Sequence, residues 1–283
     1  MLAAACTWIE GQLDRFTADR RDGSPGHLAS IKALGDLAHG ADVLARSPVP
    51  ELAERGRIWL ELAAHRLAGG ERIRELIAAS PMYAPAAVAY LALELAGRRN
   101  PALTATLAAS VTRAQLPPLA WTMLVPTLEL LGIAPSAAMH RDARRMSVLA
   151  SRTPADAMPA DAAYVLAHEC LYATRWGRDQ PRWDDETAGY VAVALPALIE
   201  RATSARDVDL LAELIAAGHA ALGTCVAPQA WQTLAAAQAP AGNLEPAPLV
   251  TMFPRLAHPA LGRTYHTTLV AIMAAAGCRH APP

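Results

Sequence analysis

Apolar residues recur along the chain at intervals of three and four, the spacing that gathers side chains on one face of an α-helix. Proline and glycine interrupt this pattern at short intervals, and no segment alternates apolar and polar positions as a half-buried strand does. The VAVA segment that begins at Val191 comes nearest to a strand, but helical patterns flank it on both sides. The pattern therefore predicts an all-α fold.

The interruptions divide the chain into helices with short connections, because proline fits the first position of a helix and glycine fits the position after its last turn. The predicted helices span residues 2–16, 27–46, 50–67, 71–79, 85–97, 101–113, 118–131, 140–150, 159–177, 184–203, 204–223, 228–239 and 263–277. Pro196 predicts a kink or a split in its helix. Ser204 and Asp207, three positions apart, resemble a capping box at the start of the next helix.

No fixed repeat period is present, which argues against tandem helical repeats. We therefore predict a single domain over residues 1–283, with roughly a dozen helices packed as helical hairpins. Both ends of the chain carry polar clusters, so the N-terminal and C-terminal helices are expected to pack together.

Composition supports helices and excludes several classes of protein. Hydrophobic residues make up 53% of the chain with only two Phe, and the abundant Ala and Leu have high helix propensity. The net charge of −1 provides no general attraction for nucleic acid or membrane. No run approaches the ~20 apolar residues of a membrane span, and the charged residues among the first sixteen positions indicate an amphipathic helix rather than a signal peptide. These features predict a cytoplasmic protein.

The four cysteines, Cys6, Cys170, Cys225 and Cys278, lie far apart and form no CxxC pair. Free thiols in a reducing compartment are therefore expected, rather than disulfides or a zinc site.

The segment of residues 159–178 contains the main candidate site. Helical spacing places five of its polar or aromatic residues on one face, opposite an apolar face: Tyr164, His168, Tyr172, Arg175 and Trp176. An imidazole titrates near neutral pH, so His168 is a candidate acid, base or hydrogen-bond donor. Glu169 follows it, but the second histidine of an HExxH motif is missing, and no metal is expected.

A second polar cluster, Tyr265, His266, Thr267 and Thr268, interrupts the last apolar helix. These side chains surround most of the helix, so some of them must be buried. Buried polar groups require hydrogen bonds, which predicts either a polar network or the wall of a pocket.

Two pairs at i, i+4 spacing each allow two interpretations. Lys32 and Asp36 form either an exposed intrahelical ion pair or an ammonium–carboxylate pair at a pocket. Glu61 and His65 form either an acid–base pair, with the carboxylate orienting the imidazole, or a structural pair at a helix junction.

The segment AHECLYATRWGR, residues 167–178, resembles the His-x-x-x-Tyr-x-Thr-Asp-x-Gly stretch of a family of uncharacterised, all-helical actinobacterial proteins from natural-product gene clusters. YHTTLV from Tyr265 resembles the C-terminal signature of that family, and WIEGQLDRF and KALGDLA resemble its N-terminal pattern. Two positions depart from it: Ala167 replaces Thr and Arg175 replaces Asp. The second change reverses a charge, which favours an anionic substrate.

The chain also resembles the larger subunit of the aziridine-forming enzymes of azinomycin-type biosynthesis. That resemblance implies ring closure by intramolecular displacement of sulfate from an amino-acid derivative on an acidic amino-group carrier protein, with a small helper subunit and no cofactor. Without a helper, a homodimer is expected. The implied base is His168, Glu61 or Asp36. The implied substrate-binding residues are Arg175, Arg178, Tyr172, His266, Tyr265, Lys32 and His65. The alternative function is that of a non-catalytic helical scaffold that binds a partner in such a pathway.

Overall fold

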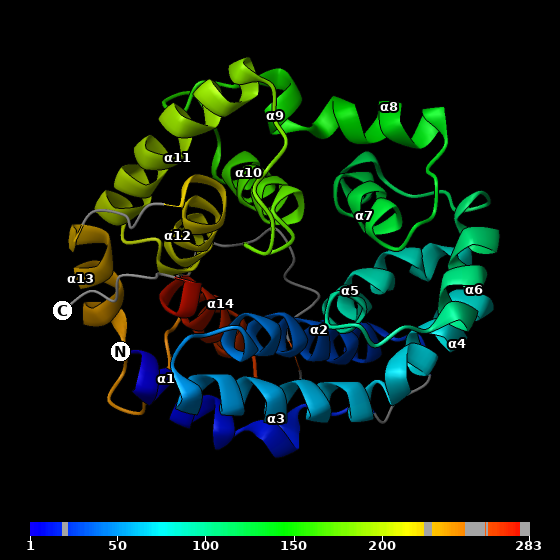
Figure 1. Cartoon of the computed structure of the whole chain (residues 1–283), viewed down its shortest axis with the longest axis horizontal. Helices are drawn as coiled ribbons and strands as arrows, with labels where there is room; N and C mark the ends of the chain where they lie inside the picture. The colour runs from blue at the N-terminus through cyan, green and yellow to red at the C-terminus, as the bar shows by residue number, and fades with distance from the viewer. Residues whose placement is uncertain (19–21, 224–227, 247–257, 259, 278–283) are drawn as a thin grey trace. The chain divides into compact units, whose positions relative to one another are not determined.

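The computed structural model describes residues 1–18, 22–223, 228–246, 258 and 260–277, and its regular structure in these residues is helical. Fourteen α-helices and three 3₁₀ helices occur in this part of the chain, and no strand does (Figure 1). The predicted all-α class is therefore confirmed.

The helices group into two compact units, each of which draws on separate segments of the chain. The first unit comprises Met1–Leu13, Ser147–Pro254 and Gly262–Pro283, and the second comprises Asp14–Met146 and Arg255–Leu261. The single domain expected over residues 1–283 stays a prediction.

In the first unit, α12 (Val208–Leu222) occupies the centre. It packs against α10 (Ala160–Ala173) on one side and α14 (Thr264–Gly277) on the other (Figure 1). Every residue of α12 from Val208 to Gly218 is buried, as expected for a helix covered on several sides. The surrounding helices are α1 (Leu2–Glu10), α9 (Val148–Ser151), α11 (Asp185–Ala205) and α13 (Pro228–Ala237). α1 packs directly on α14, which confirms the expected contact between the two ends of the chain.

In the second unit, the most extensive helix packing is between α2 (Pro25–Ala45) and α3 (Pro50–Arg66), which form a helical hairpin. Gly56 makes their close approach possible, because a Cβ atom there would lie 2.2 Å from the backbone nitrogen of Ala45. The remaining helices are η2 (Ala68–Gly70), α4 (Glu71–Ala79), η3 (Pro81–Tyr90), α5 (Leu91–Leu95), α6 (Pro101–Val111), α7 (Pro118–Leu130) and α8 (Ala137–Met146), while η1 (Leu13–Arg15) joins the two units along the chain. α7 and α8 form a second hairpin.

The helix limits agree with prediction where proline opens a helix and a turn closes it, as in α3, α6 and α7. They also agree for α4, which begins directly after Gly70. The predicted helix of residues 85–97 is wrong, because the chain forms the 3₁₀ helix η3 there, followed by the short α5. Pro85 lies inside η3 and lacks the N–H group that an α-helix starting at Pro81 would use, which favours the tighter turn.

Of the two outcomes predicted for Pro196, the split is wrong, because α11 continues through this residue with Leu195 and Leu198 on its buried face. The kink stays a prediction. The predicted cap of the next helix requires correction. The cap of α12 is Asp207 rather than Ser204, since the Asp207 carboxylate accepts the Leu210 N–H at 3.3 Å.

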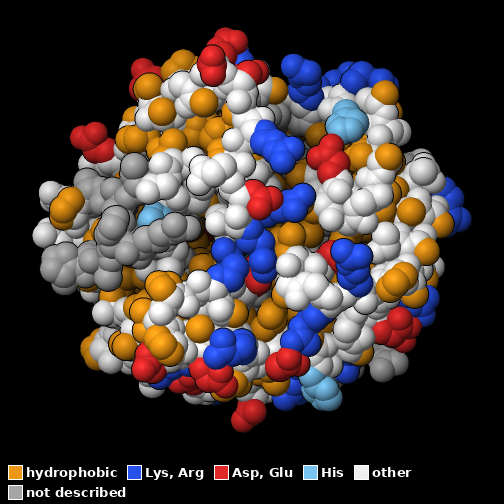
Figure 2. Space-filling view, viewed as in Figure 1, with side chains coloured by type: hydrophobic (Ala, Val, Ile, Leu, Met, Phe, Trp, Pro, Cys, Tyr) orange, Lys and Arg blue, Asp and Glu red, His pale blue; other side chains and the backbone are white. Residues whose placement is uncertain are grey.

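Surface charge is mixed. Figure 2 shows Lys and Arg side chains interspersed with Asp and Glu over the described part of one face. This agrees with the small net charge of the chain. None of the described helices has the length and apolar character needed to cross a bilayer.

Cys6 and Cys170 are buried free thiols, as expected. Burial raises the pKa of the Cys170 thiol far above its usual range, so this residue is an inert part of the core. Cys225 and Cys278 lie outside the described residues.

Candidate functional site

Two carboxylates lie on the central helix of the first unit. Asp209 and Glu213 stand at i, i+4 in the otherwise apolar α12, and each is only 3% exposed. A carboxylate is rarely buried without partners, because removing its charge from water is costly. The neighbouring helices must therefore supply hydrogen-bond donors.

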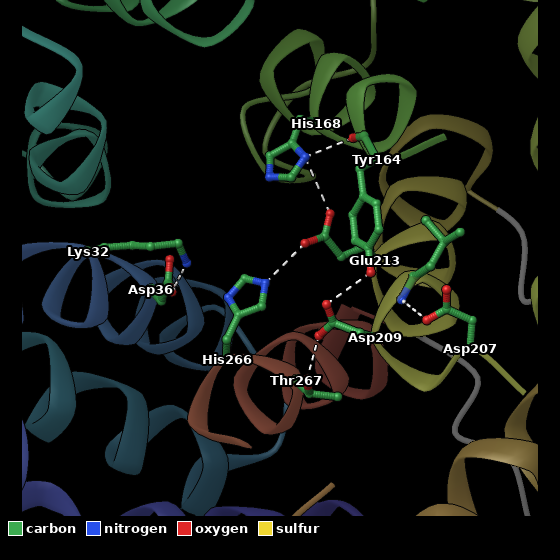
Figure 3. Close-up of polar contacts among 10 residues, drawn as sticks. Lys32, Asp36, Tyr164, His168, Asp207, Asp209, Glu213, His266 and Thr267 are labelled. Atoms are coloured by element: carbon green, nitrogen blue, oxygen red, sulfur yellow. Dashed lines mark hydrogen bonds and ion pairs between the residues drawn. The ribbon is translucent and has the colours of Figure 1, made fainter. Parts of the chain in front are cut away.

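Glu213 lies between two histidines from different helices (Figure 3). Its Oε1 is 3.1 Å from Nε2 of His266 on α14, and its Oε2 is 3.3 Å from Nδ1 of His168 on α10. One buried carboxylate thus links the two helices that flank α12.

The hydrogen bonds of His168 define the role of each ring nitrogen. Nδ1 lies 2.8 Å from the carbonyl oxygen of Tyr164, and a carbonyl only accepts, so Nδ1 carries the proton. Nε2 is then the basic nitrogen of the neutral ring, and no described residue forms a hydrogen bond with it. The side chain is 34% exposed. His168 is therefore oriented to accept a proton at Nε2, with Glu213 next to Nδ1 to stabilise the imidazolium that forms.

Asp209 is held by hydroxyl groups instead. Tyr164 donates to Oδ2 at 3.0 Å, and Thr267 donates to Oδ1 (Figure 3). Burial raises the pKa of Tyr164 above its usual range, and the negative charge of Asp209 raises it further, so the phenol remains a donor. The network predicted for the C-terminal cluster exists, and its acceptor lies on α12.

The N-cap residue of α12 adds a third carboxylate. Burial raises the pKa of Asp207, and the negative charge of Asp209 acts in the same direction. This arrangement favours a proton or a cationic group over an anion at the histidines.

The structure changes the placement of Arg175. α10 ends at Ala173, so Arg175 and Trp176 lie beyond the helix with positive φ angles of 47° and 55°, and the predicted shared helical face is wrong for both residues. The buried Thr174 hydroxyl bonds back to the Cys170 carbonyl at 2.9 Å, and the Trp176 N–H bonds to the Leu171 carbonyl at 2.8 Å. These bonds terminate the helix before Gly177.

Beyond the end of the helix, Arg175 pairs with Asp179 at 3.3 Å, and both side chains are about half exposed. Arg178 follows it and is partly exposed. Tyr172 and Tyr265 are buried, and the Tyr172 ring packs edge-on against Trp176 with a centroid distance of 4.8 Å.

The other predicted site residues belong to the second unit. Lys32 and Asp36 form the expected pair, with Nζ 2.5 Å from Oδ2 (Figure 3). Glu61 forms two hydrogen bonds with Arg98 rather than pairing with His65, and this contact lowers the pKa of the Glu61 carboxyl. The acid–base interpretation of Glu61 and His65 is therefore corrected: both side chains are exposed, and Glu61 is an ion-pair partner of Arg98.

Sequence reasoning paired His168 with His266 but missed the residue between them. The available signal was the DLLAE segment of α12, where two acids stand at i, i+4 in a helix with no other charge before His219. Among the residues that the structure describes, no group of three or more His, Cys, Asp or Glu side chains has a metal-binding arrangement.

These features define an all-α protein with two imidazoles on one buried glutamate, contributed by three packed helices. The chain belongs to the family described as "Domain of unknown function (DUF6895)", whose model matches residues 2–276. No curated protein matches the chain, and no solved structure does.

A further carboxylate next to the site allows a pH-dependent prediction. The Glu169 Oε2 accepts the N–H groups of Val148 and Leu149 at 3.1 and 3.0 Å, and burial raises the pKa of this carboxyl. A raised folded pKa means that the folded state binds the proton more tightly than the unfolded state. The resulting stability is present below the ordinary Glu pKa and is lost as pH rises through the folded value.

Glu169→Gln removes this titration while its amide oxygen still accepts both N–H groups. The free energy of unfolding of the variant minus that of the wild type should therefore be larger at pH 7 than at pH 4. Urea unfolding at the two pH values measures the difference, with the exposed Glu200→Gln as the control. The expectation would be contradicted if the stability difference between Glu169→Gln and the wild type were the same at both pH values.

Proposed function

We propose that this chain is an enzyme in which His168 acts as the general base. The observation that carries the proposal is the geometry of its imidazole: Nδ1 is held by the Tyr164 carbonyl and lies beside Glu213, while Nε2 has no hydrogen-bond partner among the described residues. A buried carboxylate near one ring nitrogen and an open second nitrogen suit a histidine that accepts a proton.

The reaction we propose is aziridine formation on an amino-acid derivative, which rests on the resemblance of the motifs around His168 and Tyr265. The amine nitrogen attacks the carbon that carries the sulfate ester, a C–N bond forms as the C–O bond breaks, and sulfate departs with the bonding electrons. The proton of the amine passes to Nε2 of His168. Atoms and charge balance without a cofactor.

The electrostatics of the site suit the amine end of such a substrate. Glu213 and Asp209 concentrate negative charge near the two histidines, and this charge attracts an ammonium group and stabilises the imidazolium after proton transfer. The departing sulfate needs cations, for which Arg175 and Arg178 after the end of α10 are the candidates. Arg175 would have to exchange its present partner, Asp179, for the sulfate.

The proposal includes partners and a compartment. A small helper subunit and an acidic carrier protein are expected from the same resemblance, with a homodimer as the form without a helper. The pathway would operate in the cytoplasm.

The test is turnover of a sulfated amino-acid derivative on its carrier protein, with release of sulfate measured by ion chromatography and ring closure by mass spectrometry. His168→Ala and Glu213→Gln should each lower turnover by ~10²-fold or more, the size typical of a lost general base. His140→Ala is the matched control, because His140 is a half-exposed histidine of the second unit. Wild-type turnover in His168→Ala would refute the proposed base, and no sulfate release by the wild type with its helper would refute the reaction.

The alternative function, a non-catalytic helical scaffold, has one observation in its favour. Glu213 and Asp209 are buried and receive their contacts from α10 and α14, so the same network also holds three helices together. In that case Glu213→Gln lowers the melting temperature, and the chain binds a pathway protein without converting its cargo.

A further inference from the structure

The chain leaves α10 through three successive left-handed residues. Arg175, Trp176 and Gly177 have φ angles of 47°, 55° and 76°. Glycine adopts this conformation freely, but a residue with a Cβ atom adopts it at an energetic cost. In the described part of the chain, Arg175 and Trp176 are the only two adjacent non-glycine residues with positive φ. One left-handed residue is enough to end a helix, as Arg206 does after α11, so the longer turn needs another explanation.

A buried threonine holds this turn in place. Thr174 is fully buried, and its hydroxyl donates to the Cys170 carbonyl at 2.9 Å and accepts the Gly177 N–H at 3.3 Å. The carbonyl of Thr174 accepts the N–H of Asp179 at 3.0 Å. Trp176 is also buried. Because its backbone is bonded to the last turn of α10 and one of its side chains lies in the core, the turn is fixed from within the protein.

The charged side chains of the fixed turn lie at the surface. Arg175 and Asp179 are 50% and 54% exposed, and the Arg175 Nε lies 3.3 Å from the Asp179 Oδ2. Arg178 is partly exposed, so the turn carries two arginines against one acid. This surplus of positive charge at an accessible position attracts anions. The Asp179 carboxylate is itself an anion held by Arg175.

This ion pair is weak enough to be replaced by a better acceptor. Two half-exposed side chains gain little from pairing, because water screens both charges and each side chain loses freedom. A sulfate ester carries a negative charge on several acceptor oxygens, so it can accept more than one N–H of a guanidinium. The contact with Asp179 therefore orients Arg175 without preventing exchange.

We propose that the turn binds the sulfate group of the substrate through Arg175, with Thr174 and Asp179 as positioning residues. Thr174 fixes the turn that presents Arg175. Asp179 holds the guanidinium before the substrate binds, and it competes with the sulfate for that position. The inference rests on the reaction proposed for His168, which lies on the helix that the turn follows.

Titration with methyl sulfate tests this assignment without any turnover. Methyl sulfate carries the sulfate-ester group alone, sodium chloride keeps the ionic strength constant, and the backbone amide NMR signals of residues 174–179 report binding at the turn. Arg175→Gly should weaken methyl sulfate binding by about tenfold or more, the size of lost charge-assisted hydrogen bonds. Asp179→Asn should strengthen it by about threefold, because it removes a competitor whose pairing contributes little.

Arg206→Gly is the matched control for Arg175→Gly. Arg206 is exposed, has a φ of 54° and follows the last residue of α11. The substitution removes the same charge from the same backbone conformation, but methyl sulfate affinity should not change.

A second pair of variants tests Thr174. Thr174→Val keeps the shape of the side chain and removes both hydroxyl bonds, whereas Thr174→Ser keeps these bonds and loses a methyl group. Thr174→Val should weaken methyl sulfate binding, and Thr174→Ser should retain it. A role in packing alone predicts no such difference in affinity. If Thr174→Val does not fold, Arg175→Gly and Asp179→Asn decide the question.

The outcomes for the subsite and for the reaction are separate. Unchanged methyl sulfate affinity in Arg175→Gly, or an equal loss in Arg206→Gly, would overturn the subsite. Unchanged affinity in Asp179→Asn would overturn the competition by Asp179. With a sulfated substrate, Asp179→Asn should also lower KM by about threefold. If the wild type binds methyl sulfate in the expected pattern but releases no sulfate from the substrate, the reaction is refuted and the anion site is supported.

Discussion

Replacing Gly56 by alanine should lower the free energy of unfolding by about 3 kcal/mol or more, the upper range for overpacking a buried contact. Gly56 lies where α3 crosses α2, and a Cβ atom there would be 2.2 Å from the Ala45 nitrogen and 2.6 Å from the Ala41 carbonyl oxygen. Both atoms belong to the backbone of α2, so no side chain can move aside to relieve the overlap. The two helices would have to separate, with loss of the contacts that join them.

The control for this substitution is Gly189→Ala. Gly189 lies within α11, and a Cβ atom there meets nothing within 4 Å. Alanine has the higher helix propensity, so this variant should be more stable than the wild type by about 0.5–1 kcal/mol. Urea unfolding monitored by circular dichroism measures both changes. Equal effects of the two substitutions would contradict the proposed close approach at Gly56.

The double variant Tyr164→Phe, Thr267→Val should lose about 3–5 kcal/mol of stability, as expected when a buried charge loses its partners. Both substitutions keep the shape of the side chain and remove a hydroxyl that donates to Asp209. Asp209 would then lie at 3% exposure without either donor. Each single variant should lose less than half of the total, because one donor remains.

Neutralising the acceptor distinguishes this explanation from a simple packing defect. Adding Asp209→Asn to the double variant should restore part of the stability, since an amide is less costly to bury than a carboxylate. Tyr190→Phe is the matched control, because the Tyr190 hydroxyl donates to the neutral Thr153 carbonyl at 2.8 Å and its loss should cost about 1 kcal/mol. A double variant no less stable than Tyr190→Phe would show that Asp209 does not depend on these donors.

Local sequence signals predicted most of the helices because proline and glycine act on the nearest few residues. Pro50, Pro101 and Pro118 each stand at the first position of a helix, where the expected limits hold. The signals failed where the outcome depended on competing local bonds. Thr174 and Trp176 close α10 earlier than Gly177 would. The prolines of η3 favour a 3₁₀ helix although the apolar pattern alone suits an α-helix.

The candidate site could be predicted only in part, since its centre depends on contacts between helices that are distant in the sequence. His168 and His266 were predictable because each is a titratable residue in an apolar helix. Glu213 belongs to the segment that looks most like pure core, and nothing local indicates that its two oxygens meet imidazoles from α10 and α14. The same limit applies to Glu61, whose partner, Arg98, lies on a different part of the chain.

The packing of α1 on α14 has a consequence for folding during synthesis. α1 ends at Glu10 and its partner helix begins at Thr264, so α1 is translated long before α14. At ~5–20 residues per second, α1 waits for tens of seconds with the apolar face of Cys6 and Ile9 uncovered. Such distant contacts also slow folding, because a long loop must close before they form. Chaperone dependence and sensitivity to early proteolysis should therefore concentrate on the first helix.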